Sequence, residues 1–559
     1  MFYCLQALFR QFTRLSGMTG TALADAPEIE LTYGLKVTTV PTALPVARRD
    51  YPDVAFKSRI AANAALVKEI CNVGGGQPEG RPCLVGTTSV AASEVLVAAL
   101  AKQGIKAELL NASPKNAPRE SEIIAQAGRA GVVTVATNMA GRGTDILLGG
   151  CSKTMSRIKT RSVLVESGVL SPEESSFLPP SPPESYFPCV IDDDIIVTLK
   201  YASSAIKKEF GSGLSAIKLD EILTVANDST ESEEDPEYIV KLRDATNAVK
   251  STYADVLDEE KEVVKARGGL YVMGTNRHES SRIDAQLRGR SGRQGDPGSS
   301  RFFLSFEDDM FVLFGGDKLN NILKTFRVSD DMPVEAPQVS DALDKVQLAV
   351  EQKYREIRAE IFRFDETLNS QRQVVYERRQ NILFSTPEAT AEEMKKYNSG
   401  TVENIVNAQT DESGIVNVAK VVEKIAMFFP LVPLKENDLS GNDGKATTEF
   451  ISNKVNQIFV DKMNETEVAA KAAGRLPMGL ARSANYITLV TMDNAWSEHL
   501  QNMENLKESV VLRKYEGLDS VTAYRNEAFV LFQGLTDTMR NNAVYSLWQS
   551  LGAPQPVVG

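Results

Sequence analysis

An alternation of short apolar runs with amphipathic stretches, beginning near Arg81, constrains the fold of this chain more than any other feature. The short runs predict strands, and the amphipathic stretches between them predict helices. Strands that are separated by helices build a parallel sheet, so the sequence predicts an α/β domain. The expected strands are 82–87, 107–111, 132–137, 269–274 and 301–306, and the expected helices are 90–102, 118–127 and 279–291.

Residues 151–267 interrupt this alternation. The stretch 178–183 contains four prolines and cannot continue a helix or a sheet, and 231–237 is a cluster of acidic residues. We interpret 151–267 as an insertion in the α/β domain, and we expect helices within it at 195–210 and 238–267.

The hydrophobic period becomes helical in the second half of the chain. Apolar residues recur at spacings of three and four from Leu343 to Ile382, which predicts a single helix roughly 60 Å long. A helix of this length needs neighbours packed along it, so it indicates a scaffold. Residues 387–475 predict a mixture of helices and polar loops. Two further amphipathic helices, the first containing Trp496, then predict a helical hairpin with a polar turn at 512–519.

Composition excludes several classes of function. The chain has 62 Lys and Arg against 74 Asp and Glu, a net charge of −12, so we expect no nucleic-acid partner, although the charge alone does not exclude one. Five cysteines without a C-x-x-C pair and only two histidines, His278 and His499, argue against disulfide frameworks and metal sites. We expect both histidines to have structural roles. The longest strongly apolar stretch, 425–434, contains two prolines and falls short of the ~20 residues that cross a bilayer.

The first candidate for a functional site is the segment 136–145, Ala-Thr-Asn-Met-Ala-Gly-Arg-Gly-Thr-Asp, at the end of an expected strand. Gly141 and Gly143 let the backbone turn closely around Arg142, and an arginine held there can reach a phosphate. Asp145 is placed to accept a hydrogen bond from a ribose hydroxyl or to orient an arginine.

The second segment begins at Gln286 and reads Gln-Leu-Arg-Gly-Arg-Ser-Gly-Arg, on the helix that follows the next strand. Arg290 and Arg293 are three residues apart, so we expect them on one helical face, with Arg288 pointing elsewhere. Two guanidinium groups on one face suit arginine fingers, which neutralise charge on a γ-phosphate during transfer. A basic surface making ordinary ion pairs is the alternative, but the presence of both segments in one α/β domain favours the functional interpretation.

The sequence lacks the other half of such a site. A nucleotide hydrolase of this type needs a G-x-x-x-x-G-K-S/T loop around the phosphates and an acidic pair that holds magnesium. The 559 residues contain no such loop, and no acidic pair follows a suitable strand before Arg142. We therefore expect the chain to contribute only the arginine side of an ATP cleft. Its abrupt apolar beginning at Met1 leads us to expect an N-terminally truncated form.

Together these motifs resemble the second RecA-like domain of superfamily 2 helicase-type motors, and the flanking sequence resembles the SecA family of preprotein translocase ATPases. The resemblance covers nearly the whole chain except 151–267 and 387–475. The long insertion, Phe187-Pro-Cys189, Gly315-Gly316 and the run Leu-Asn-Ser-Gln-Arg at 368–372 resemble the plastid and cyanobacterial branch of the family. The matching stretches are 17–22, 40–42, 84–89, 137–145, 268–269, 277–280, 282–284, 286–296, 298–302, 369–372 and 496–500.

The resemblance implies a RecA-like P-loop NTPase domain followed by an all-α scaffold, a wing and a two-helix finger. The implied parts are a remnant of the first nucleotide-binding domain at 1–45, the second such domain at 46–330, a scaffold helix at 331–386, a helical wing at 387–475, and a scaffold continuation with the finger at 476–559.

The resemblance also implies roles for individual residues. Arg290 and Arg293 would be the arginine fingers. The residues implied to bind ATP are Asp145, Arg142, Gly141, Gly143 and Gln286. Outside the nucleotide site, Arg282 would form a gate pair with an acidic residue of the missing part of the first domain, and Tyr515 at the finger tip would contact the substrate polypeptide. The segment implied to couple nucleotide state to domain closure is Thr19-Gly20-Thr21.

The implied function is that of the ATP-driven motor of the Sec translocase, which moves polypeptides across the thylakoid membrane or the bacterial inner membrane. Its cofactors would be ATP with Mg²⁺, whose ligands would lie in the first domain. Its partners would be a SecYEG-type channel, an unfolded preprotein, the membrane surface and a second copy of the chain. The location would be the plastid stroma and thylakoid membrane, or the bacterial cytoplasm and inner membrane. Two alternatives stay open, a non-catalytic module that binds a partner or the channel, and a C-terminal fragment of a nucleic-acid helicase.

Overall fold

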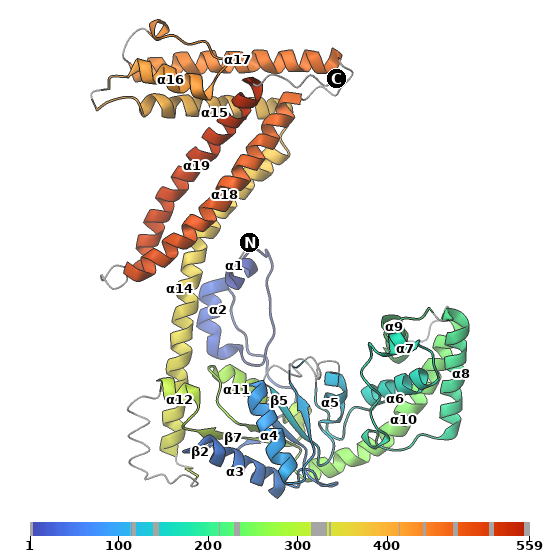
Figure 1. Ribbon diagram of the computed structural model, residues 1–559. Coiled ribbons are helices and arrows are strands. Elements are labelled where there is room, and N and C mark those ends of the chain that lie inside the picture. Colours follow the sequence, from blue (N-terminus) through green and yellow to red (C-terminus); the bar gives the residue numbers. More distant parts are fainter. Residues whose placement is uncertain are drawn as a thin grey trace. The chain divides into compact units, whose positions relative to one another are not determined.

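The computed structural model divides the chain into two units (Figure 1). One unit is Ser16–Arg355, and the other combines Met1–Leu15 with Glu356–Gly559. The structure describes residues 4–111, 113, 119–137, 145–211, 213–228, 235–314, 333–334, 337–412, 414–439, 443–472, 479–513 and 519–552.

A parallel sheet forms the centre of the unit 16–355, as the strand and helix alternation predicts. The sheet order is β1-β7-β6-β3-β5-β4, with β2 also beside β7, and every pairing between these strands is parallel. The strands β1 and β2 were not expected from the sequence. The bounds are β1 (Arg48–Asp50), β2 (Val54–Phe56), β3 (Cys83–Thr87), β4 (Ala107–Leu110), β5 (Val133–Thr137), β6 (Leu270–Gly274) and β7 (Gly298–Ser305).

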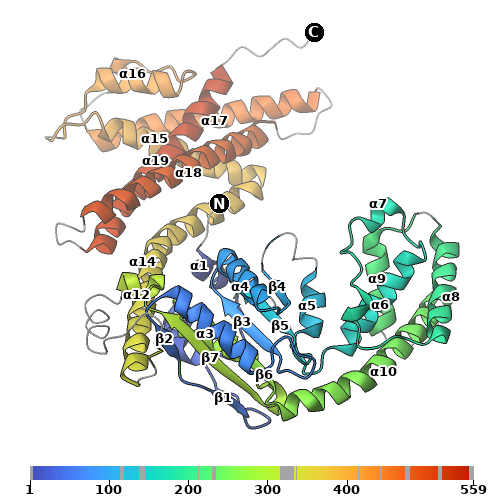
Figure 2. The ribbon, with the colours of Figure 1, turned by 60° about the horizontal axis from the view of Figure 1, so that its bottom comes forward.

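Alternate residues of the central strand β3 belong to different hydrophobic cores, because successive side chains of a strand point to opposite faces. Cys83 and Val85 pack into one core with residues of α3 (Arg59–Asn72) and α4 (Val90–Lys102). Figure 2 shows these two helices along one face of the sheet. Leu84 packs into the second core, on the opposite face.

The second core joins the sheet to the helices on its other side. It contains residues of α5 (Glu120–Gln126), α11 (Ser281–Arg288), α12 (Asp309–Phe314) and the first part of α14 (Pro337–Leu383). The shorter elements of this unit are η1 (Ala22–Asp25), α2 (Ala26–Tyr33), η3 (Glu184–Tyr186) and η4 (Arg293–Gly295).

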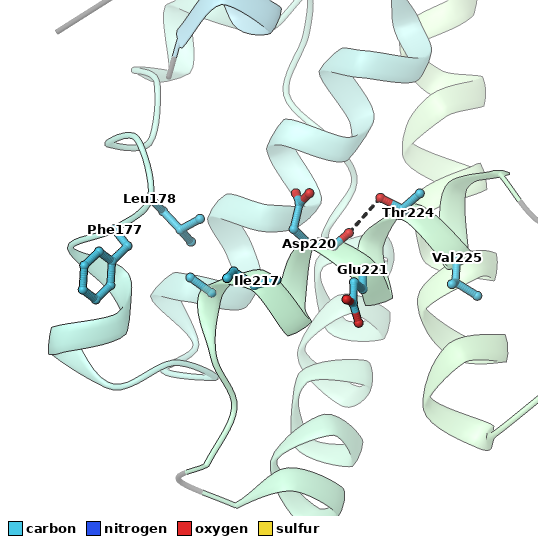
Figure 3. Close-up of a pocket in the computed structure, with 8 residues that line it drawn as sticks. Phe177, Leu178, Ile217, Asp220, Glu221, Thr224 and Val225 are labelled. Atoms are coloured by element: carbon cyan, nitrogen blue, oxygen red, sulfur yellow. Dashed lines mark hydrogen bonds between the residues drawn. The ribbon is translucent and has the colours of Figure 1, made fainter. Parts of the chain in front are cut away.

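The strands β5 and β6 both pair with β3, so the chain between them crosses over β3. Residues 151–267 lie in this crossover and form a helical subdomain with its own core (Figure 2). The expected helices at 195–210 and 238–267 are confirmed, whereas α6 and α9 were not expected. The helices are α6 (Ser152–Glu166), α7 (Pro172–Ser175), α8 (Asp193–Phe210), α9 (Ala216–Asp228) and α10 (Glu237–Ala266). Figure 3 shows outward residues of α9, including Ile217 and Asp220.

The second unit is helical. The single long helix expected from Leu343 to Ile382 is confirmed as α14, and the hairpin is confirmed as α18 and α19. Trp496 of α18 is buried in the core that the hairpin shares with α14. The bounds are α1 (Leu5–Phe9), α15 (Pro387–Asn407), α16 (Val418–Phe428), η5 (Glu436–Asp438), α17 (Gly444–Ala472), α18 (Gly479–Arg513) and α19 (Ser520–Gly552).

The helices α15, α16 and α17 share one core with the C-terminal part of α19. Trp548 is fully buried there, and its indole Nε1 donates a hydrogen bond to the side-chain oxygen of Asn398 at 3.0 Å. In the described part of the chain, none of the helices combines the length and the hydrophobicity that a membrane crossing needs.

Candidate functional site

A pocket of about 620 Å³ lies at the carboxyl ends of β3 and β5, a volume within the usual range for ligand sites. Ligands of open parallel sheets bind at this edge. The pocket brings together several residues that the sequence analysis singled out from segments far apart in the chain. They are Thr19, Gly20, Thr21, Gln286, Arg290 and Arg293.

The helix α11 reaches the pocket because it packs closely on β3 at Gly86. A Cβ atom at Gly86 would lie 2.5 Å from Cδ2 of Leu287, so a side chain there would displace the Leu287 side chain that packs α11 on the strand. The close approach places Ala285 and Gln286 in the pocket wall. The glycine therefore sets the distance between the helix and the strand.

The expected helix over 279–291 ends earlier, at Arg288. The buried hydroxyl of Ser291 donates to the backbone oxygen of Leu270 at 2.7 Å, which ties the following turn to β6. Gly292 then adopts φ 70°, a left-handed conformation that ends the helical path. The prediction that Arg290 and Arg293 share a helical face is therefore wrong.

Both arginines nevertheless line the pocket from this turn. Arg293 is half-buried, and its Nε donates to the backbone oxygen of Gly289 at 2.9 Å. Its guanidinium group also forms an ion pair with Asp145. Of the two roles expected for Asp145, the structure shows the orientation of an arginine, and contact with ATP stays a prediction.

The segment Thr19-Gly20-Thr21 forms another wall of the pocket. The hydroxyl oxygens of Thr19 and Thr21 lie 3.3 Å apart, and the side-chain nitrogen of Gln286 lies 3.5 Å from the Thr21 hydroxyl. The structure thus places the expected coupling segment beside the arginine turn. Whether it couples nucleotide state to movement stays a prediction.

Arg282 points to a different partner from the one that the resemblance implies. Its guanidinium donates to a carboxylate oxygen of Asp25 at 2.6 Å, and Arg355 lies 3.4 Å from the other oxygen. Asp25 belongs to this chain and lies shortly after the coupling segment. A gate pair with a first-domain residue stays a prediction.

Four of the expected site residues lie outside the described residues. They are Gly141, Arg142, Gly143 and Tyr515.

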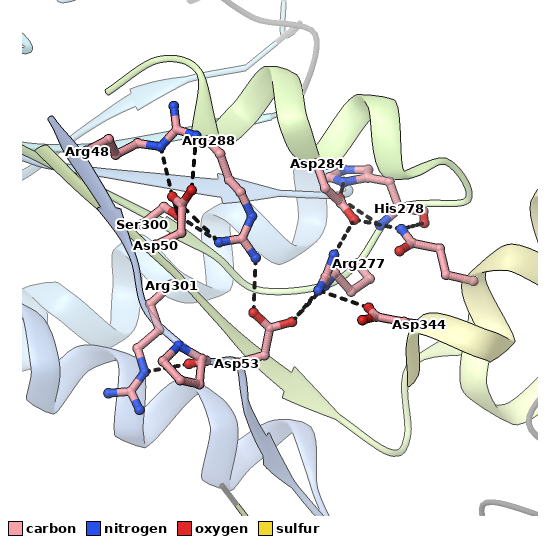
Figure 4. A network of polar contacts seen from close by, with 12 residues as sticks. Arg48, Asp50, Asp53, Arg277, His278, Asp284, Arg288, Ser300, Arg301 and Asp344 are labelled. Carbon is pink, nitrogen blue, oxygen red and sulfur yellow. Dashed lines mark hydrogen bonds and ion pairs between the residues drawn. The ribbon is translucent and has the colours of Figure 1, made fainter. Parts of the chain in front are cut away.

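A network of buried charges holds α11 and the strands beside it (Figure 4). Asp53 accepts hydrogen bonds from Arg277 at 2.8 Å and from Arg288 at 3.1 Å. Arg277 also lies 3.4 Å from Asp344 of α14. Burial alone would lower the pKa of Arg277, but the carboxylates of Asp53 and Asp284 raise it above the usual value. Arg277 therefore stays charged inside the fold.

Asp284 is the second centre of this network. It accepts from the backbone nitrogen of His278 at 3.0 Å and from the Gln347 side chain at 2.7 Å, and it lies 2.7 Å from Nδ1 of the His278 ring. These contacts fix the loop before α11 to the first turns of α14, and they agree with a structural role for His278. Neither Asp53 nor Asp284 was predicted as a site residue, although acidic residues interspersed among the motif arginines are a signal for such pairing.

The donors around the pocket fit the phosphates of a nucleotide. Arg290 and Arg293 offer guanidinium groups, Thr19 and Thr21 offer hydroxyls, and Gln286 offers an amide. Guanidinium groups match phosphate oxygens in charge and geometry. No group of three or more His, Cys, Asp or Glu side chains able to hold a metal occurs within the described ranges.

Comparisons with known proteins agree with this geometry. Residues 45–331 match the family description "SecA P-loop domain", and residues 333–550 match "SecA Wing and Scaffold domain". Proteins named "Protein translocase subunit SecA" are similar along nearly the whole chain. The relative from Prochlorococcus marinus (strain NATL1A) is 38% identical over 99% of this chain and 60% of its own length.

Two other relatives carry the same name. The relative from Parasynechococcus marenigrum (strain WH8102) is 40% identical over 98% of this chain and 60% of its own length. The relative from Synechococcus sp. (strain JA-3-3Ab) is 39% identical over 97% of this chain and 59% of its own length. The chain thus spans about 60% of the length of these curated relatives. Because the family descriptions cover most of the sequence, the resemblance found in the motifs is confirmed, and the chain belongs to the SecA family.

Proposed function

We propose that this chain supplies the arginine side of the ATP site in a Sec translocase motor. The observation that supports this most is the pocket at the carboxyl edge of the sheet, in which Arg290 and Arg293 meet Thr19, Thr21 and Gln286. These side chains come from separate segments, and they offer cationic and hydrogen-bonding groups to one space of about 620 Å³.

In this proposal Arg290 and Arg293 stabilise negative charge on the terminal phosphate, and Gln286 and the threonines position the nucleotide. ATP, when bound, supplies the phosphoryl transfer whose free energy drives the motor. The ion pair with Asp145 holds the Arg293 guanidinium in place before it meets phosphate oxygens. Gly141, Arg142 and Gly143 complete the phosphate contacts by their position in the family motif.

Movement at the pocket would pass to α14 through ion pairs and hydrogen bonds of α11 and the coupling segment. Asp284 on α11 is joined through Gln347 to α14, and Asp25, just after the coupling segment, is joined to Arg282 of α11 and to Arg355 of α14. A ligand shifts a conformational equilibrium only through contacts that differ between the two states. The arginine contacts with nucleotide would supply that difference.

Hydrolysis would require a domain that this chain does not contribute. The 559 residues contain no G-x-x-x-x-G-K-S/T segment. The magnesium ligands would belong to the domain that carries this segment, because in this type of site they accompany the phosphate loop. The chain alone would therefore not hydrolyse ATP.

The relatives' name, "Protein translocase subunit SecA", is the basis for proposing partners. We infer that the motor acts on an unfolded preprotein at a SecYEG-type channel, binds the membrane surface peripherally, contacts the polypeptide through Tyr515 and pairs with a second copy. The membrane would be the thylakoid, with the plastid stroma as compartment, or the bacterial inner membrane, with the cytoplasm as compartment.

An ATPase assay on the 559-residue chain tests the proposal. We expect no turnover above background for the chain alone, and turnover once the N-terminal portion of a cyanobacterial SecA relative is added in trans. Arg290→Ala or Arg293→Ala should lower the restored rate about 10³-fold or more, as for other arginine fingers. Arg267→Ala is the matched control, since Arg267 is an exposed arginine of the same unit paired with Glu79.

Two results would overturn the proposal. ATP turnover by the chain alone that Arg290→Ala abolishes would show that the chain contains a complete ATP site. A restored rate that is unaffected by both arginine variants would show that the turn does not serve the nucleotide.

A further inference from the structure

The helical subdomain 151–267 is strongly acidic. It contains 14 Lys and Arg against 22 Asp and Glu, a net charge of −8, whereas the whole chain has −12. Most of the chain's net negative charge is therefore concentrated in about a fifth of its residues. An excess of one sign attracts partners of the opposite sign and repels anionic surfaces.

This subdomain has a groove of about 540 Å³ along α9 (Figure 3). The buried face of α9 consists of Leu219, Ile222, Leu223 and Ala226, which pack into the subdomain core. The opposite face follows the same helical spacing and lines the groove with Ile217, Asp220, Glu221, Thr224 and Val225. Arg157 of α6 hydrogen-bonds Asp220 and Thr224 on this second face, whereas its apolar residues Ile217 and Val225 are exposed.

Phe177 and Leu178, which follow α7, form the other wall of the groove. The side chains of Phe177 and Ile217 are each 76% exposed. Single exposed apolar residues are ordinary on protein surfaces, but several that line one groove mark an interaction site. The helical stripe on α9 suits a second helix laid against it.

The charges of the groove select the partner. Its lining includes the carboxylates of Asp220 and Glu221 and no Lys or Arg. Asp220 pairs with Arg157 at 2.6 Å, and Glu221 pairs with Lys218 at 2.9 Å, both at the surface. Exposed pairs of this kind contribute little to stability, so cations of a partner can replace them.

We propose that this groove binds a basic amphipathic helix of a partner protein. The apolar face of that helix packs on Phe177, Ile217 and Val225, and its Lys and Arg side chains reach Asp220 and Glu221. The inference is independent of the nucleotide pocket, because none of the groove residues lines that pocket.

Binding of designed peptides to the full 559-residue chain, without nucleotide, tests the proposal by fluorescence anisotropy. The probe is an 18-residue helical peptide with a Leu face and a Lys face. One comparison peptide replaces Lys by Glu, and another replaces Leu by Ser. We expect binding of the Leu/Lys peptide, weakened by salt, and at least tenfold weaker binding of both comparison peptides.

Variants of the chain locate the peptide. Phe177→Ser and Ile217→Ser should each raise the Kd of the Leu/Lys peptide at least tenfold. Val190→Ser is the matched control, because Val190 is 83% exposed on the same subdomain but does not line the groove. The double variant Asp220→Asn with Glu221→Gln should weaken binding and flatten its salt dependence.

Absence of binding, equal binding of the Leu/Glu peptide, or an equal effect of Val190→Ser would overturn the proposal. Binding to vesicles of phosphatidylglycerol that Phe177→Ser abolishes would also overturn it, since the groove would then be a lipid site. Arg290→Ala should leave peptide binding unchanged, so failure here and failure of the ATP-site proposal are distinguishable.

Discussion

His499 should make the stability of the helical unit depend on pH. Its side chain is 3% exposed on α18, and Nε2 lies 2.9 Å from the side-chain oxygen of Gln371. The Gln371 nitrogen donates to the backbone oxygen of Ala528 at 2.9 Å, so its oxygen faces the histidine and accepts the Nε2 proton. The neutral ring therefore carries its proton on Nε2, and burial lowers the pKa of His499 from 6.5 to about 4.

The direction of this pH dependence follows from the protons that the folded and the unfolded chain bind. Between about pH 6.5 and 4 the unfolded chain binds a proton at His499 that the folded chain does not, so stability falls as pH decreases through this window. From these two pKa values, lowering the pH from 7 to 5 should cost about 2 kcal/mol of unfolding free energy from this group alone.

Urea unfolding followed by tryptophan fluorescence measures this effect. Both tryptophans of the chain, Trp496 and Trp548, lie in the helical unit, so the signal reports that unit. The wild type should lose about 2 kcal/mol more between pH 7 and 5 than His499→Gln, which does not titrate. His278→Gln is the control, because it removes the histidine of the other unit. Parallel pH profiles for the wild type and His499→Gln would refute the reasoning.

Two further predictions concern the unit 16–355, and calorimetric unfolding measures both. Gly86→Ala should destabilise it by about 1–3 kcal/mol and weaken nucleotide binding, because the new Cβ meets Leu287 at 2.5 Å. Gly534→Ala is the control and should not destabilise the protein, because nothing lies within 4 Å of the added Cβ. Equal effects of the two substitutions would contradict the packing argument. Asp284→Ala should cost about 3–5 kcal/mol, since Asp284 is 2% exposed and its loss leaves Arg277 without one of its carboxylates. Asp284→Asn keeps one acceptor oxygen and should cost less than Asp284→Ala, and no measurable cost of Asp284→Asn would show that the buried charge is unimportant.

The parts of the fold that local pattern determines were predictable. The strands around β3, the helix α14 and the hairpin all have hydrophobic periods that persist over the whole element. The strands β1 and β2 have no such signal, because Arg48-Arg-Asp50 is charged and becomes a strand only by pairing with β7, some 250 residues later. Pairing between distant segments cannot be inferred from local sequence alone.

The motifs predict Arg290 and Arg293 as site residues, and both line the pocket. The expected geometry was wrong, because the helix carrying Gln286 ends before both of them. Gly292, at φ 70°, is a local signal for this turn, but the hydrogen bond from the Ser291 hydroxyl to the backbone of Leu270 in β6 forms only in the folded chain. The charge network around Asp284 was missed for the same reason, because its partners come together only in the folded chain.

The crossover from β5 to β6 has a consequence for how this family can diversify. The sheet fixes only the two ends of that connection, and the free-energy cost of lengthening it grows slowly, by about 0.6 kcal/mol for each doubling. Whole helices can therefore be gained, lost or exchanged there during evolution while the strands that flank the pocket keep their register. New binding surfaces can thus arise at this point without rebuilding the sheet.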